Sequence, residues 1–478
     1  MQNKSLLKKF LSFSYGSWIG IIIGIVSTPV ITRLLTPEDF GKASMFTIAL
    51  NILMVFVMFG SDQSFVRFFY EEEEEARGKL LYKCLYIPGI IMVGVAVIMA
   101  LFYKRISFFL FREESFELMT VLIAGIFFQI VYRYAVLVVR MKQRGNIYSI
   151  LEMLNKVLNF GFILLLYFIM GDQYEIIVYS TILSFAFLIV VAIYFEKDIW
   201  NIKNILSKKV INGRREIFKF SSPLMVSTFI TMMFQSFDRM AIKHWSNFRE
   251  LGVYAAAFKI VAILTILQST FSTFWAPVSH ENFKKDPNDM QLYERMARLV
   301  SVGMFTVAIG TIMGKDILVF MLGKGYEKVG LIMPFLVFIP VLYTISDTTV
   351  LGINFMKKSK WHILIAALSC LVNIAGNLLL VPKNGAIGSA ITAAITYIVF
   401  FTLRTVVSKK YMKADYGLKK VYGGITMIFC YALIQLYWKD GVINFVVGAF
   451  LLLVLYYMYK KDIMELIKNR TFFTKIRE

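Results

Sequence analysis

The sequence predicts an all-α integral membrane protein with about fourteen transmembrane helices. Hydrophobic residues make up 58% of the 478-residue chain, and charged residues make up only 17%. Soluble domains average about 25% charged residues, so this chain has too few charges to cover a water-facing surface of its size. Its apolar residues also form runs of about 20, the length that a helix needs to cross a bilayer. We therefore expect a multi-pass membrane protein.

The expected spans follow one another along the whole chain. The first apolar run comes after three lysines, as in a signal peptide, but it is long and lacks a small-residue cleavage site, so we expect it to be retained. The spans are expected to start near Phe13, Ala43, Leu80, Glu117, Ile147, Tyr174, Glu216, Gly252, Arg295, Val329, Trp361, Gly385, Leu418 and Gly441.

Basic residues are distributed unequally between alternate loops. If the amino terminus is cytoplasmic, the loops on that side hold 35 of the 52 lysine and arginine residues, and the outer loops hold 12. This bias follows the positive-inside rule and predicts an inner-membrane protein with both termini in the cytoplasm. It accounts for most of the formal net charge of +21 without nucleic acid as a partner. The acidic run from Glu71 to Glu75 is interpreted as a solvated charge run.

Several classes of activity lack their sequence signatures. The predicted outer loops are short and no GxxxxGK[ST] motif occurs, so neither a large external catalytic domain nor ATP hydrolysis is expected. The three cysteines, Cys84, Cys370 and Cys430, lie far apart in apolar segments and indicate neither a disulfide framework nor a metal site. We expect no enzymatic activity, no cofactor and no metal.

A sequence pattern near the amino terminus recurs about halfway along the chain. Arg33 and Arg239 are 206 residues apart, and Gly41 and Gly252, each preceded by an acidic and then an apolar residue, are 211 apart. Six predicted spans separate the copies, and an even number gives both halves the same orientation, as in parallel repeats. We therefore expect two bundles around a central cavity, which is an organisation typical of transporters.

The repeat predicts the domain organisation. The expected parts are an N-terminal six-helix bundle at 1–197, a basic cytoplasmic linker at 198–215, a C-terminal six-helix bundle at 216–408, and two additional helices with a basic cytoplasmic tail at 409–478.

The first predicted helix combines a glycine face with a proline. Gly16, Gly20 and Gly24 are four residues apart, so one face has no side chains and another helix or a ligand can approach it closely. Pro29 removes a backbone hydrogen bond and is expected to kink the helix. Ordinary packing is the simplest explanation of such a helix. Because the segment recurs in part, we interpret it as a gating helix, with Pro29 as its hinge and the glycines as the face along which it slides.

Ionised groups within the predicted spans need a reason, because each costs about 2.5 to 3.5 kcal/mol at the centre of a bilayer. Cations outnumber anions among them, and a cationic cavity attracts an anion. Arginine suits phosphate because its planar guanidinium donates two hydrogen bonds at once. The candidate substrate-binding residues are Arg133, Lys156, Arg239, Lys259 and Arg33, of which Arg33 has the alternative role of an interfacial anchor.

The candidates differ in the local partners that the sequence offers. Glu152 lies four residues before Lys156, and we expect the two to form a structural pair. Arg133 and Lys259 have no obvious local partner, which favours a water-filled cavity over a buried ion pair.

Two aspartates are candidates for a coupling-ion site. Asp347 is isolated in an apolar span, and the hydroxyl groups of its neighbours offer an alternative that satisfies it without an ion. Asp238 lies near the outer end of the seventh predicted span. We expect a proton or sodium ion at one of them, and Asp347 is the better candidate.

Three segments resemble the polysaccharide repeat-unit flippases of the Wzx type, within the multidrug/oligosaccharidyl-lipid/polysaccharide exporter superfamily. They are Thr32 to Phe46, Phe237 to Ile260 and Leu371 to Ile398. In the third, Asn373, Asn377, Pro382, Gly385 and Gly388 look like the pattern of the family. With the hydropathy profile, the resemblance covers nearly the whole chain.

The resemblance implies a flippase that moves an undecaprenyl-diphosphate-linked oligosaccharide repeat unit to the outer leaflet by alternating access, for O-antigen, capsule or exopolysaccharide assembly. It implies membrane lipid and the polysaccharide polymerase or chain-length machinery as partners, and we expect a monomer.

Three other functions compete with this one. Drug-exporting relatives commonly carry an acidic residue in the first helix, and Phe13 to Leu35 contains none, which disfavours a cation-coupled multidrug exporter. A membrane glycan polymerase or ligase would normally show a long outer loop with catalytic arginine or histidine, and the sequence predicts none. A flippase for a peptidoglycan or teichoic precursor stays an alternative, because the carrier lipid is shared.

Overall fold

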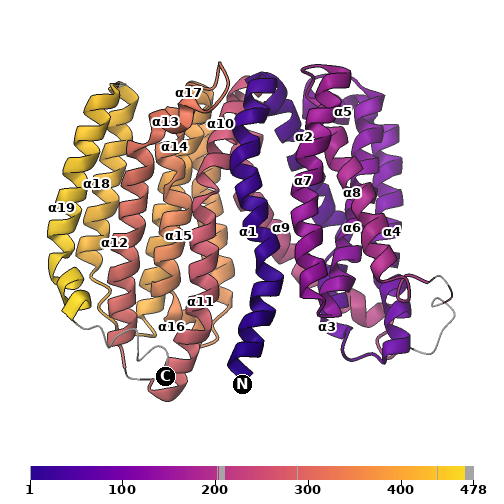
Figure 1. Cartoon of the computed structure of the whole chain (residues 1–478), viewed down its shortest axis with the longest axis horizontal. Coiled ribbons are helices and arrows are strands. Elements are labelled where there is room, and N and C mark those ends of the chain that lie inside the picture. The colour runs from indigo at the N-terminus through magenta and orange to yellow at the C-terminus, as the bar shows by residue number, and fades with distance from the viewer. Residues whose placement is uncertain (1, 202, 204–209, 288, 439, 469–478) are drawn as a thin grey trace. The chain divides into compact units, whose positions relative to one another are not determined.

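The computed structural model describes residues 2–201, 203, 210–287, 289–438 and 440–468 (Figure 1). Within these ranges the chain forms α-helices and short turns, with one 3-10 helix and no strand. The all-α class that the sequence predicts is therefore confirmed.

The chain divides into two compact units, Met1–Ser236 and Phe237–Glu478, and the division falls inside helix α9 (Arg214–Trp245). The elements before α9 are α1 (Gln2–Leu34), α2 (Pro37–Met58), α3 (Ser61–Phe68), η1 (Glu74–Ala76), α4 (Arg77–Leu101), α5 (Tyr103–Phe111), α6 (Phe116–Met141), α7 (Gly145–Met170) and α8 (Glu175–Phe195). The elements after α9 are α10 (Phe248–Val261), α11 (Leu264–Lys285), α12 (Gln291–Met313), α13 (Lys315–Phe320), α14 (Val329–Leu336), α15 (Phe338–Thr349), α16 (Leu351–Phe355), α17 (Lys360–Lys409), α18 (Leu418–Tyr437) and α19 (Gly441–Lys468).

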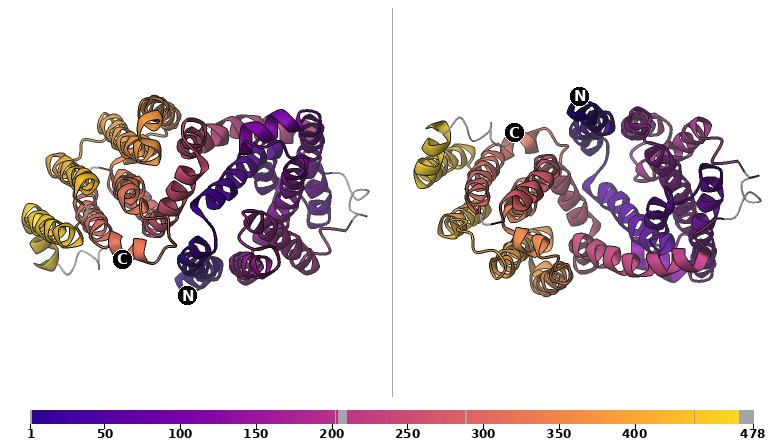
Figure 2. Two further views of the ribbon diagram at one scale, coloured as in Figure 1. Left: turned by 90° about the horizontal axis from the view of Figure 1, so that it is seen from above. Right: turned by 90° about the horizontal axis from the view of Figure 1, so that it is seen from below.

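The predicted limits of the bundles stay predictions. Residues 202 and 204–209 of the predicted linker, and 469–478 of the predicted tail, lie outside the described residues. In the second unit, α12, α18 and α19 lie side by side at one edge, and Figure 2 views these helices almost end-on.

In the described part of the chain, ten helices are long and apolar enough to cross a membrane, or eleven if α10 and α11 count as one span with a 44° bend. The chain is therefore a multi-pass membrane protein. The 50-residue α17 contains two of the predicted spans, which meet at Gly385, where the backbone leaves the helical region with a φ of +54°. The total of fourteen spans stays a prediction.

The recurring sequence pattern has a local structural cause. Thr36 caps α2 by accepting a hydrogen bond from the backbone N–H of Asp39 at 3.2 Å, and its hydroxyl donates to the Asp39 carboxylate. Asn247 caps α10 in the same way, accepting from the N–H of Glu250 at 2.9 Å. An acidic residue three positions after the cap is favoured because it interacts with the unpaired N–H groups and the dipole of the helix end. The repeat therefore marks the start of one helix in each unit.

Part of the acidic run is buried, which corrects its interpretation as wholly solvated. Glu72 is 3% exposed, and its two carboxylate oxygens accept hydrogen bonds from the backbone N–H groups of Ile211 and Asn212, each at 2.9 Å. The amide side chain of Asn212 donates to the same carboxylate at 3.1 Å. Glu72 thus fixes the segment that leads into α9 to the loop that precedes α4.

The glycines of α1 contact α7 unequally. A Cβ atom at Gly16 would lie 2.1 Å from the carbonyl oxygen of Ser149, and one at Gly20 would lie 3.1 Å from Cγ of Lys156. A Cβ atom at Gly24 would meet nothing within 4 Å. The first two glycines therefore allow close approach of the helices, and Pro29 lies farther along α1.

We expect Gly16→Ala to destabilise the protein, because the added methyl group cannot fit against the backbone of α7 without a shift. Overpacking of this kind costs about 1 to 3 kcal/mol. The measurement is the midpoint of thermal unfolding of the purified protein in detergent. Gly24→Ala is the matched control, since it adds the same methyl group to open space and improves helix propensity. Equal midpoints for the two variants would contradict the packing that we describe.

Candidate functional site

Asp238 is the centre of a buried hydrogen-bond cluster in the second unit. Its Oδ1 accepts hydrogen bonds from the side-chain amides of Asn373 and Asn377, each at 2.8 Å. Its Oδ2 accepts one from the hydroxyl group of Tyr254 at 2.9 Å. The aspartate is only 7% exposed, and a carboxylate is tolerated in such a place only when it is hydrogen-bonded or charge-compensated.

The cluster joins α9, α10 and both parts of α17. The hydroxyl group of Ser389, beyond the break in α17, donates to the side-chain carbonyl of Asn377 at 2.8 Å. The two parts of α17 approach closely, since a Cβ atom at Gly388 would lie 2.4 Å from the carbonyl oxygen of Leu380. Two segments that carry the sequence resemblance therefore meet at Asp238. Sequence reasoning found this aspartate but missed Tyr254 and Ser389, which carry no charge to distinguish them.

Arg239 follows Asp238 on α9, and Lys259 lies on α10, the helix that also carries Tyr254. The guanidinium group of Arg239 lies over the ring of Phe258, 4.3 Å from its centroid, a cation–π geometry. The Nε atom of Arg239 is buried and has no hydrogen-bond partner among the described residues. Lys259 follows Phe258 on α10 and has an exposed side chain.

Asp347 is paired with an arginine from another helix. Its carboxylate lies 3.3 Å from Nη2 of Arg404 on α17 and accepts a hydrogen bond from Ser272 on α11 at 2.5 Å. Arg404 also donates to the hydroxyl group of Ser346, and its side chain is 8% exposed. The alternative in which neighbouring hydroxyl groups satisfy Asp347 does not hold for Thr348 and Thr349, because their hydroxyl groups donate to backbone carbonyls instead.

Among the predicted site cations of the first unit, Arg133 is the one that an ion pair holds in a fixed orientation. Its Nη2 and Nε atoms lie 3.0 and 3.3 Å from a carboxylate oxygen of Asp62 on α3, so its ion-pair partner comes from another helix and is not local in sequence. Its side chain is nevertheless 52% exposed, and Nη1 has no partner among the described residues. Asp62 was not found from sequence because it is 71 positions away and lies in a short polar segment between spans.

The remaining candidates of the first unit are more exposed. Among the described residues, Glu152 and Lys156 do not form the ion pair that the sequence suggests, although the carboxylate of Glu152 interacts electrostatically with both Lys156 and Arg133. The side chain of Lys156 is exposed and lies against Gly20 of α1. Arg33 is exposed in the last turn of α1.

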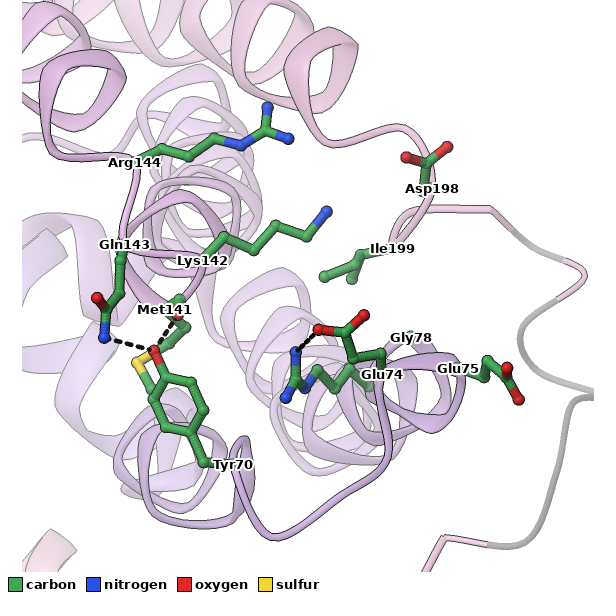
Figure 3. A pocket seen from close by; sticks show the side chains of 11 residues that line it. Tyr70, Glu74, Glu75, Gly78, Met141, Lys142, Gln143, Arg144, Asp198 and Ile199 are labelled. Atoms are coloured by element: carbon green, nitrogen blue, oxygen red, sulfur yellow. Dashed lines mark hydrogen bonds and ion pairs between the residues drawn. The ribbon is translucent and has the colours of Figure 1, made fainter.

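A hollow of about 670 Å³ lies at the loops of the first unit (Figure 3). Its lining includes Tyr70, whose hydroxyl group donates to the carbonyl of Met141, and an ion pair of 3.3 Å between Arg77 and Glu74. Lys142 and Arg144, also in the lining, pair with the buried Glu196 at 2.7 and 3.1 Å. None of the residues predicted as a site lines this hollow, and its charges are mixed in sign.

Comparison with solved structures identifies the class of fold. A structure of the lipid II flippase MurJ in an inward closed conformation superposes with a TM-score of 0.68 at 15% identity, over 95% of this chain and 99% of that chain. The inward-facing conformation of a multidrug resistance MATE family transporter of the MOP superfamily superposes with a TM-score of 0.59 at 12% identity, over 82% and 94%. The protein therefore has the fold of the membrane transporters and flippases of the MOP superfamily.

The sequence comparison narrows this class. The profile of the polysaccharide biosynthesis protein family matches residues 6–283, which is more than half of the chain. The chain belongs to this family. Comparison with curated protein sequences gives no match. The resemblance inferred from sequence is thus confirmed for the polysaccharide biosynthesis family and for the fold, and the Wzx type stays a proposal.

We expect Arg404→Ala to lower the free energy of unfolding by about 3 kcal/mol, because it leaves the mostly buried carboxylate of Asp347, whose side chain is 17% exposed, without its charge partner. The measurement is unfolding of the purified protein in detergent. The double variant Asp347→Asn, Arg404→Met removes both charges and should recover much of the loss. A double variant that is as unstable as the single one would show that the pair is not the source of the effect.

Proposed function

We propose that the protein is a flippase that moves a polyprenyl-diphosphate-linked oligosaccharide repeat unit from the cytoplasmic to the outer leaflet of the inner membrane. The product would serve O-antigen, capsule or exopolysaccharide assembly. The observation that carries the proposal is Arg133, a half-exposed guanidinium on a membrane-spanning helix of a polysaccharide biosynthesis family member. A cationic side chain within the bilayer costs free energy, and binding of an anionic substrate offsets that cost.

The proposed ligand for this cation is the diphosphate group. Asp62 holds two nitrogen atoms of Arg133 and leaves Nη1 to donate to a phosphate oxygen. Lys156 and Lys259 are exposed lysines on membrane-spanning helices. Each adds a positive charge on a flexible side chain, which can attract a phosphate group without the fixed hydrogen-bond geometry that an arginine imposes. Arg239 and Arg33 complete the proposed set of residues that bind the diphosphate and the glycan.

Alternating access is the proposed transport cycle, with the first helix as the gate. The hydroxyl groups of Ser27 and Thr28 donate to the carbonyl of Gly24 in the turn before Pro29, an arrangement that often bends helices. This supports Pro29 as the proposed hinge. An inside-negative potential of 100 mV would favour outward movement of about two negative charges by roughly 4 to 5 kcal/mol, so the potential alone biases the cycle.

Asp238 is the better of the two proposed coupling-ion sites. The charge of Asp347 is already compensated by Arg404, whereas the hydrogen-bond donors on Asp238 are two amides and a phenol, all neutral. Rotation of the two amide groups would turn their oxygen atoms toward the carboxylate, and an all-oxygen set suits a hard cation such as sodium. A proton is the alternative occupant.

A second candidate function is transport of a peptidoglycan or teichoic precursor. The fold shared with the lipid II flippase MurJ favours this alternative, and the carrier lipid would be the same. Depletion of the protein in its host distinguishes the two, because the lipid-linked intermediate that accumulates on the cytoplasmic face identifies the substrate. Neighbouring genes for glycosyltransferases and a polymerase would support the repeat unit. A multidrug exporter is the third rival and should confer drug resistance.

We expect Arg133→Ala and Lys259→Ala each to abolish glycan export while the protein stays in the membrane, because each loses a charge that the diphosphate needs. The measurement is surface polysaccharide, with membrane content measured in parallel. Arg105→Ala is the control, since Arg105 is an exposed arginine of α5 outside the proposed site. Normal export in both variants would remove these residues from the mechanism.

We expect Asp238→Asn to remove the dependence of transport on an ion gradient, because the neutral side chain cannot hold a cation. The measurement is lipid translocation in proteoliposomes with an imposed sodium or proton gradient. Asp347→Asn is the comparison and should keep the gradient dependence. The opposite pattern would move the coupling site to Asp347, and dependence in neither wild type nor variant would leave the membrane potential as the driving force.

A further inference from the structure

A groove of about 350 Å³ lies on the exposed face of α4 in the first unit. It is lined by Tyr86, Gly89, Ile90 and Val93. Gly89 follows Pro88, and a Cβ atom at Gly89 would meet nothing within 4 Å, so the groove exists because this position has no side chain. The carbonyl of Cys84, which Pro88 leaves without its helical donor, accepts a hydrogen bond from Tyr134 at 3.2 Å.

The groove continues into an apolar stripe. Beyond it, Val97 is 52% exposed and Leu101 is 73% exposed. Together with Tyr86, Ile90 and Val93, these residues recur every three or four positions, which places them on one face of the helix. The stripe therefore leads from the groove along α4 to its end, on a face that no described helix covers.

The other end of the groove is cationic. The guanidinium group of Arg214, the first residue of α9, lies over the ring of Tyr86 at 3.7 Å from its centroid. Among the residues that the structure describes, no carboxylate lies within ion-pair distance of Arg214. Arg215 and Lys219 are exposed on the same end of α9, and Glu216 is the acidic residue between them. The distribution of basic residues predicts that this end is cytoplasmic.

We propose that this groove binds an anionic phospholipid of the bilayer, with its phosphate group on Arg214 and an acyl chain along the stripe of α4. The charge of the unpaired guanidinium complements an anionic headgroup, and the apolar stripe begins directly beneath it. The stripe is open to the surrounding lipid along its length, so a bilayer lipid reaches it laterally. The bound lipid would join the start of α9 to α4.

The test uses the full-length protein in phosphatidylcholine vesicles that contain a phosphatidylglycerol with a photoreactive group near the end of its acyl chain. After irradiation, we expect labelling to concentrate in the peptide of α4 that contains the groove. Excess phosphatidylglycerol should suppress the labelling, and excess phosphatidylcholine should not. Arg214→Gln should remove this preference, whereas Lys461→Gln, an exposed cation of α19, should keep it.

A matched pair of glycine variants tests the groove itself. Gly89→Phe places a ring in the groove and should lower labelling several-fold, while Gly161→Phe, which also points into open space but lies on α7, should leave it unchanged. Both side chains enter open space, so both variants should fold. Equal labelling of the two variants would overturn the proposal. So would stronger displacement by a polyprenyl phosphate, which would indicate the carrier lipid, or a cross-link between two copies through α4.

Discussion

The second unit depends on the burial of one carboxylate. Asp238 lies inside a protein that offers few polar groups, and it is stable there only because donors reach it from α10 and α17. Those donors fix the register of three helices at once, since a shift of any one would leave a buried polar group without a partner. The break in α17 at Gly385 belongs to the same constraint, because it returns the chain so that Ser389 reaches Asn377.

Much of the helical organisation could be predicted from sequence, because lipid imposes a simple rule on helix length and polarity. The predicted starts near Val329, Leu418 and Gly441 coincide with the starts of α14, α18 and α19. The recurring pattern could also be found from sequence, because a capping residue and the acidic residue three positions after it form a short local signal for the start of a helix.

The partners of the charged residues could not be predicted in the same way. Arg133 and Asp62 are 71 positions apart, and Arg404 and Asp347 are 57 apart. Ion pairs between helices join residues that have no fixed separation in the sequence, whereas pairs within a helix form between residues three or four positions apart. The local pair that spacing did suggest, Glu152 with Lys156, is not formed among the described residues, which shows that helical spacing permits a contact without requiring it.

Exposure separates the cations that hold the fold from those that are free to bind a ligand. Arg404 is almost completely buried, its Nη1 and Nη2 atoms donate to Ser346 and Asp347, and its guanidinium group also lies over the rings of Tyr343 and Phe400. Arg133 is paired as well, but half of its side chain is open and one nitrogen is left over. An ion pair of the first kind stabilises the fold, whereas one of the second kind orients a guanidinium toward something else. Because an oriented guanidinium loses little freedom when a phosphate binds, Asp62 has a direct place in the proposed recognition of substrate.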